Sequence, residues 1–174
     1  MKRTVLLSLI AGVVLFMWGF VSHAVLPWHD AVYHKFADET AFSVAIRNNA
    51  PQRGIYYLPY SDADRGPGKP EAFVNVLPQG PGRTLASKMV LGLTIQVVSA
   101  LLVISLVRRS ASSTYWHRVG LFSFVGIIIG FTSHAYYWNW FQFPSAYVVI
   151  TILDISIAWT LAGLVVAKFM TREG

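Results

Sequence analysis

Cysteine is missing from this chain of 174 residues. Without thiols there is no disulfide framework, no thiolate nucleophile, no Cys-ligated zinc or iron–sulfur cluster and no covalently attached c-type haem. Charge is scarce as well, because 13 % of the residues are charged whereas 55 % are hydrophobic. This composition excludes an ordinary soluble domain and is typical of an integral membrane protein.

Signature motifs of catalysis are also missing. The sequence has no nucleophile elbow, no phosphate-binding glycine loop, no HExxH pair and no pair of carboxylates at catalytic spacing. These absences favour a non-catalytic protein over an enzyme.

Long apolar runs are what the sequence has instead. A hydrocarbon core about 30 Å thick needs roughly 20 apolar residues in a helix. The runs that qualify are 4–26, 85–107, 119–140 and 145–167. They predict an all-α integral membrane protein with four transmembrane helices. The first run resembles a signal peptide, but it is longer than the roughly 7–15 apolar residues of such a peptide, so we expect an uncleaved anchor.

The net charge of +6 indicates how the spans are oriented. Basic residues near the span ends gather on one side of the membrane: Lys2, Arg3, Arg108, Arg109, Arg118, Lys168 and Arg172. Most other basic residues are spread over 27–84, among acidic side chains. The positive-inside rule then predicts cytoplasmic termini and an extracytoplasmic 27–84, with the bacterial inner membrane as the expected location. The charge marks topology, and we expect no nucleic-acid partner.

The spans divide the chain into three parts. Residues 1–26 hold the cytoplasmic N-terminus and the first helix, residues 27–84 form the extracytoplasmic segment, and residues 85–174 hold the remaining helices and the cytoplasmic C-terminus.

The extracytoplasmic segment predicts a short helix and a β-hairpin. Asp38 is a suitable N-cap for a helix over 39–49. Residues 55–58 and 72–77 read as strands on either side of a turn rich in Gly and Pro. A module of this size without a disulfide or a metal seldom builds a stable core. We therefore expect it to pack on its own helix bundle or on a partner.

A hexapeptide of the first span recurs in the third. Residues 19–24 (GFVSHA) match residues 130–135 (GFTSHA) at five of six positions. In each copy a histidine follows a glycine by four residues, so both lie on one helix face. Glycines on these faces are predicted to let helices pack closely: Gly12, Gly19, Gly126 and Gly130.

The outer-leaflet histidines leave three interpretations open. His23 and His134 could hydrogen-bond between closely packed helices, which is the simplest interpretation and implies no cofactor. They could instead ligate a b-type haem from facing helices. A metal ion could bind His23, His29 and His34, although their spacing is not a known zinc signature.

Asp154 is the ionisable residue placed deep in a span, roughly 14 Å from the outer end by helical rise. A carboxyl group there needs a partner. Gln96 lies at similar depth in the second span, so the sequence predicts an intramembrane pair of Asp154 and Gln96. A proton relay or a transport pathway are the alternatives, but no broken helix marks a transport site.

These observations favour a small accessory subunit or assembly factor that docks a partner through 27–84. The partner would be a membrane or extracytoplasmic protein, or a second copy of the chain in a homo-oligomer, with the lipid bilayer around the helices. A redox protein that binds haem or metal is the alternative, and a minor transporter is the third option.

Overall fold

The computed structural model describes residues 2–110 and 114–170. Four helices in these ranges are long and apolar enough to cross a membrane: α1 (Lys2–Ala24), α3 (Leu85–Arg109), α4 (Tyr115–Phe141) and α5 (Ser145–Val166), which a 3₁₀ turn over Ala167–Phe169 extends. The four predicted spans are confirmed as helices to within a few residues. The chain is therefore a membrane protein by the length and composition of its helices.

Local sequence explains where α4 and α5 begin and end. The Thr114 hydroxyl accepts the amide of His117 and caps the start of α4. Gln142 has φ 52, a left-handed conformation that ends α4. Pro144 precedes the first residue of α5, where the fixed φ of proline suits the entry to a helix. The two helices are consequently joined by a very short turn.

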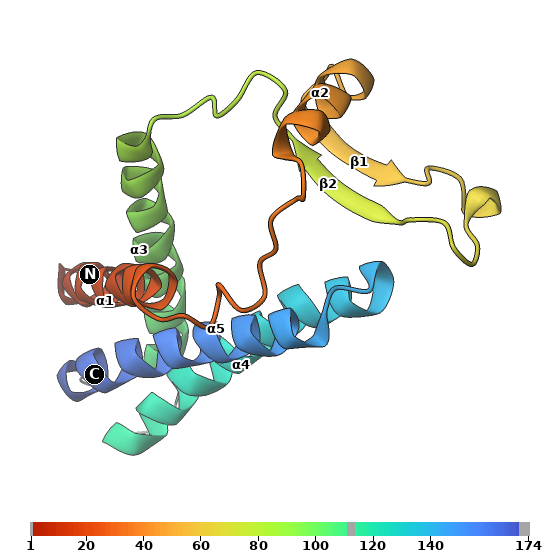
Figure 1. Cartoon of the computed structure of the whole chain (residues 1–174). Helices are drawn as coiled ribbons and strands as arrows, with labels where there is room; N and C mark the ends of the chain where they lie inside the picture. The colour runs from red at the N-terminus through yellow and green to blue at the C-terminus, as the bar shows by residue number, and fades with distance from the viewer. Residues whose placement is uncertain (1, 111–113, 171–174) are drawn as a thin grey trace. The chain divides into compact units, whose positions relative to one another are not determined.

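The membrane-spanning helices and residues 25–33 form one compact unit. In this unit α1 packs against α3 and α5, and α4 runs beside α5 (Figure 1). Its core consists of buried side chains from every span: Leu7, Ala11, Leu15, Ala100, Val103, Ile104, Val107, Phe122, Trp159, Ala162, Val166 and Met170. Large apolar side chains also cover the outer faces of the helices, as a hydrocarbon environment requires.

The predicted packing glycines behave differently from one another. A Cβ added to Gly12 would lie 2.5 Å from Val97 of α3, so these two helices touch at the glycine. At Gly126 and Gly130 the added atom would lie 2.8 and 3.1 Å from the nearest atoms of α5. Gly19 has nothing within 4 Å. Three of these four glycines thus lie at close helix contacts. The two copies of the hexapeptide differ, because Gly130 lies at such a contact and Gly19 does not.

Residues 34–84 form the second compact unit. It contains α2 (Glu39–Asn49), β1 (Gly54–Leu58) and β2 (Ala72–Val76). The strands pair antiparallel, with Tyr56 opposite Val74. Asp38 accepts the Ala41 amide at 2.8 Å and caps α2. The predicted short helix and hairpin are therefore confirmed.

The compact unit that contains the spans extends past the end of α1. Residues 27–33 belong to the membrane unit, because the chain turns back on α1 after the helix ends. The amide of Leu26 bonds the carbonyl of Val21 at 3.1 Å, and the amide of Val32 bonds the carbonyl of His29, also at 3.1 Å. These bonds close a tight turn, and it brings polar side chains to the end of α1.

Candidate functional site

A buried polar cluster lies where the end of α1 meets α5. Ser22 comes from the last turns of α1, Trp28 and His29 from the turn that follows, and Asp154 from the middle of α5. Ser22 is fully buried, and His29 and Asp154 are 3 % and 7 % exposed. Buried polar groups in an apolar bundle need partners. The contacts of each group therefore indicate what the cluster can do.

Asp154 bonds to Trp18 of α1 and not to the predicted partner Gln96. The indole Nε1 of Trp18 donates to Asp154 Oδ1 at 2.6 Å and lies 3.2 Å from its backbone carbonyl oxygen. Gln96 instead lines an apolar groove of about 500 Å³ between α1 and α3, together with Gly19. Asp154 of α5 pairs with Trp18 of α1 because α1 lies against α5 as well as α3.

His29 uses only one of its ring nitrogens in the cluster. Its Nε2 lies 3.0 Å from the Ser22 hydroxyl and 3.4 Å from Asp154 Oδ2. Its Nδ1 is buried and has no hydrogen-bond partner. Trp28 Nε1 donates to the carbonyl and the hydroxyl of Ser22, at 3.2 and 3.1 Å. The imidazole of His29 thus makes its polar contacts through Nε2, and Nδ1 makes none.

Serine, histidine and aspartate are also the residue types of a hydrolase triad. In a triad the serine and the carboxylate bond to different nitrogens of the imidazole. Here Ser22 and Asp154 both approach Nε2 of His29. Ser22 is also fully buried, so no substrate could reach its hydroxyl. The cluster does not have the geometry of a nucleophilic site.

A row of aromatic rings joins the two histidines of the repeated hexapeptide. The ring of His23 stacks on His29 with centroids 3.9 Å apart, and His29, Tyr33, Tyr147 and His134 follow at 6.3, 6.3 and 6.2 Å. Partial burial and, after it, the neighbouring Tyr147 raise the pKa of Tyr33 above its ordinary value of 10.0. Three rings separate His23 from His134, whereas a bis-histidine haem needs both imidazoles at one iron.

The metal-ligand set suggested by sequence is brought together only in part. His23 and His29 lie side by side, and Asp154 joins them, with one ligand atom from each residue within 4.8 Å of the others. His34 belongs to the other unit. The sequence does not place Asp154 with the two histidines, because the closeness of Asp154 to them depends on which helix packs against α1.

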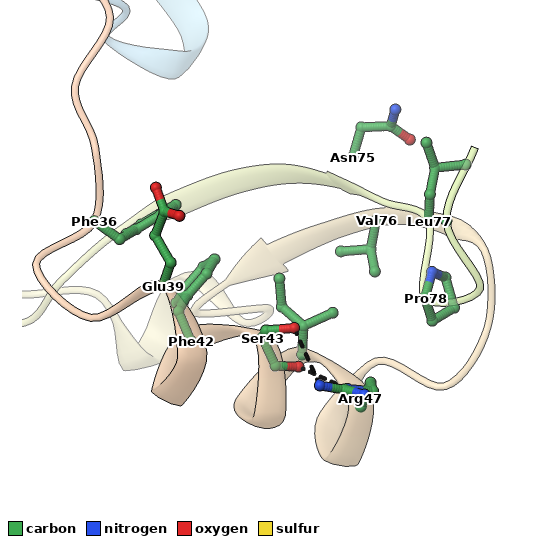
Figure 2. Close-up of a pocket in the computed structure, with 11 residues that line it drawn as sticks. Phe36, Glu39, Phe42, Ser43, Arg47, Asn75, Val76, Leu77 and Pro78 are labelled. Atoms are coloured by element: carbon green, nitrogen blue, oxygen red, sulfur yellow. Dashed lines mark hydrogen bonds between the residues drawn. The ribbon is translucent and has the colours of Figure 1, made fainter.

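The second unit carries a groove of about 460 Å³ between α2 and the segment that ends β2. Figure 2 shows Phe36 and Phe42 at one end and Val76, Leu77 and Pro78 across from the helix. The two phenyl rings stack with centroids 3.8 Å apart. α2 has no fully buried residue. Helix and hairpin therefore leave much of their apolar surface accessible.

Comparisons with protein-family models, with curated proteins and with solved structures find no match to this chain.

Proposed function

We propose that this protein is a non-catalytic accessory subunit or assembly factor of a membrane complex. Its extracytoplasmic segment, residues 27–84, docks on a membrane or extracytoplasmic protein through the folded unit 34–84. The observation that carries this proposal is the small core of that unit compared with its exposed apolar surface.

The burial pattern of the second unit supports a docking role. Ala50 and Val76 are the buried hydrophobic residues in 34–84. Tyr60 is 91 % exposed, and Ile55 and Leu58 of β1 are more than half exposed. A two-stranded sheet with one helix is marginally stable in water, and exposed apolar patches of this kind mark interaction sites. A partner protein would cover this surface and stabilise the module.

The same proposal places the protein in the bacterial inner membrane with both termini in the cytoplasm. It rests on the density of Lys and Arg beside the span ends. Reporter fusions after Lys2, near Asp62, near Ser112 and after Gly174 should report inside, outside, inside and inside. An outside signal near Ser112 would refute this topology.

The docking role is tested by the native mass of the protein after gentle detergent extraction. We expect a complex that is heavier than the 19.4 kDa chain and whose protein mass is not a whole-number multiple of it. Ile55→Ser combined with Tyr60→Ser should release the chain from this complex, because both side chains are exposed on the hairpin. Val44→Ser is the matched control, since Val44 is also an exposed apolar residue of the same unit but lies on α2.

Two results would contradict the docking role. One is a stable, monodisperse monomer of the wild-type chain. The other is a complex whose mass is unchanged by the Ile55 and Tyr60 substitutions.

A further inference from the structure

We propose that His23, His29 and Asp154 form a binding site for a divalent transition-metal ion of the zinc type. This site lies wholly within the membrane unit and is independent of the docking role of residues 34–84. Two imidazoles and one carboxylate supply three protein ligands, and water supplies a fourth, as in open zinc sites.

The distance between two of the ligand atoms fits a shared metal ion. His29 Nε2 lies 3.4 Å from Asp154 Oδ2. Two ligands bound to zinc at about 2.0–2.1 Å, at the tetrahedral angle, are about 3.3 Å apart. A cation between the two atoms would therefore bind both with little movement of either side chain.

The hydrogen bond made by His23 leaves its other ring nitrogen available to bind a metal. Its Nδ1 lies 3.1 Å from the carbonyl oxygen of Gly19. A carbonyl accepts only, so Nδ1 carries the proton and donates, and Nε2 keeps its lone pair for a metal. The three ligand atoms lie within 4.8 Å of one another, so His23 must move closer to bind. Its side chain is exposed, so the ring can turn away from His29 and the ion can enter from its side.

The contacts of His29 converge on one ring nitrogen. The His29 side chain is 4 % exposed, yet Nδ1 has no partner while Nε2 faces both Ser22 and Asp154. The unpartnered Nδ1 is on the other edge of the ring, and it would carry the proton of the neutral imidazole when Nε2 binds a metal. A cation at Nε2 explains why two electron-rich groups converge on that atom.

The charge and orientation of Asp154 also favour a cation at this site. Trp18 and His29 are its partners among the described residues, and neither is a permanent cation. A carboxylate buried in an apolar bundle is costly unless a positive charge compensates it. The bond from Trp18 to Oδ1 fixes the carboxylate so that Oδ2 faces His29, as an outer partner does for a metal ligand. A divalent cation would supply the missing charge.

Zinc binding by the full-length protein in detergent tests the proposal. The protein is stripped with a chelator, incubated with Zn²⁺ and desalted, and its metal content is measured. Titration with Co²⁺ then reports the ligand geometry through visible absorption. We expect one ion for each chain and the strong bands of a four-coordinate cobalt site.

Substitutions separate this site from nonspecific binding. His23→Gln, His29→Gln and Asp154→Asn should each weaken Zn²⁺ binding at least about 100-fold, and Trp18→Phe about 10-fold, since outer partners contribute about 10–100-fold. His134→Gln is the matched control, because it removes the equivalent histidine of the repeated hexapeptide, and it should leave binding unchanged.

Two results would overturn the proposal. One is wild-type protein that retains no Zn²⁺. The other is binding that His23→Gln leaves as strong as wild type. His23→Gln is the deciding variant, because the ring is exposed, hydrogen-bonds to its own helix and otherwise stacks on His29, so its loss should not impair folding. Helical content and elution volume confirm the fold of each variant.

Discussion

Replacing Gly126 by alanine should drive α4 away from α5. The added Cβ would lie 2.8 Å from the Cβ of Trp159 and 3.1 Å from the carbonyl oxygen of Ile155. Carbon atoms in ordinary contact lie about 3.5 Å or more apart, so the helices would have to separate by roughly 0.7 Å. The obstacle includes backbone, and a rotamer change cannot relieve it.

The expected loss of stability follows from two opposing terms. Overpacking of a tight contact costs about 1–3 kcal/mol. Alanine in place of glycine within a helix returns up to about 1 kcal/mol. We therefore expect Gly126→Ala to lower the free energy of unfolding by up to about 3 kcal/mol, with a central value of about 1–2 kcal/mol.

Gly19→Ala is the matched control, because Gly19 has nothing within 4 Å of the added atom. Only the helix-propensity term applies there, so this variant should be neutral or up to about 1 kcal/mol more stable. Unfolding of both variants in mixed micelles, followed by circular dichroism, measures the difference. A Gly126→Ala protein as stable as Gly19→Ala would refute the contact between α4 and α5 as described.

Three further predictions concern single side chains. Asp154→Leu should lower the free energy of unfolding by about 1–3 kcal/mol, because Trp18 Nε1 loses its side-chain acceptor and keeps only the longer contact to the backbone carbonyl. Asp154→Asn keeps a side-chain acceptor and should cost less than about 1 kcal/mol; a costlier Asn variant in the same assay would contradict this. The absorption spectrum of the purified protein should lack a Soret band, and a band that disappears in His23→Ala or His134→Ala would establish the haem alternative. Arg118→Gln should speed hydrogen exchange at the end of α5, because Nη1 of Arg118 bonds the last carbonyls there; unchanged exchange would argue against that cap.

The helices of this protein were predictable because each depends on a local property of the sequence. An apolar run of about 20 residues must be helical in a bilayer whatever its neighbours are. Asp38 likewise caps α2 through contacts within one turn. The hairpin strands followed from apolar runs on both sides of a turn rich in Gly and Pro.

The partners of Asp154 were not predictable in the same way. Depth in the membrane suggested Gln96, but depth does not say which helix lies beside which. The contact of α1 with α5 brings Trp18 to the carboxylate, and a tight turn after Ala24 brings His29 to the same place. Trp18 was visible in the sequence only as one aromatic residue in an apolar run. Which helices are neighbours is a global property, and the pattern of a single sequence does not reveal it.

The bond between Trp18 and Asp154 joins residues 136 positions apart, and this has a consequence for biosynthesis. α1 precedes α5 in the chain, so it leaves the ribosome first. Spans insert one by one and associate afterwards. The bond can therefore form only after α5 has inserted, and α1 must remain accessible at the insertion machinery until then. A chain released without α5 would leave the indole of Trp18 and the imidazole of His29 without Asp154.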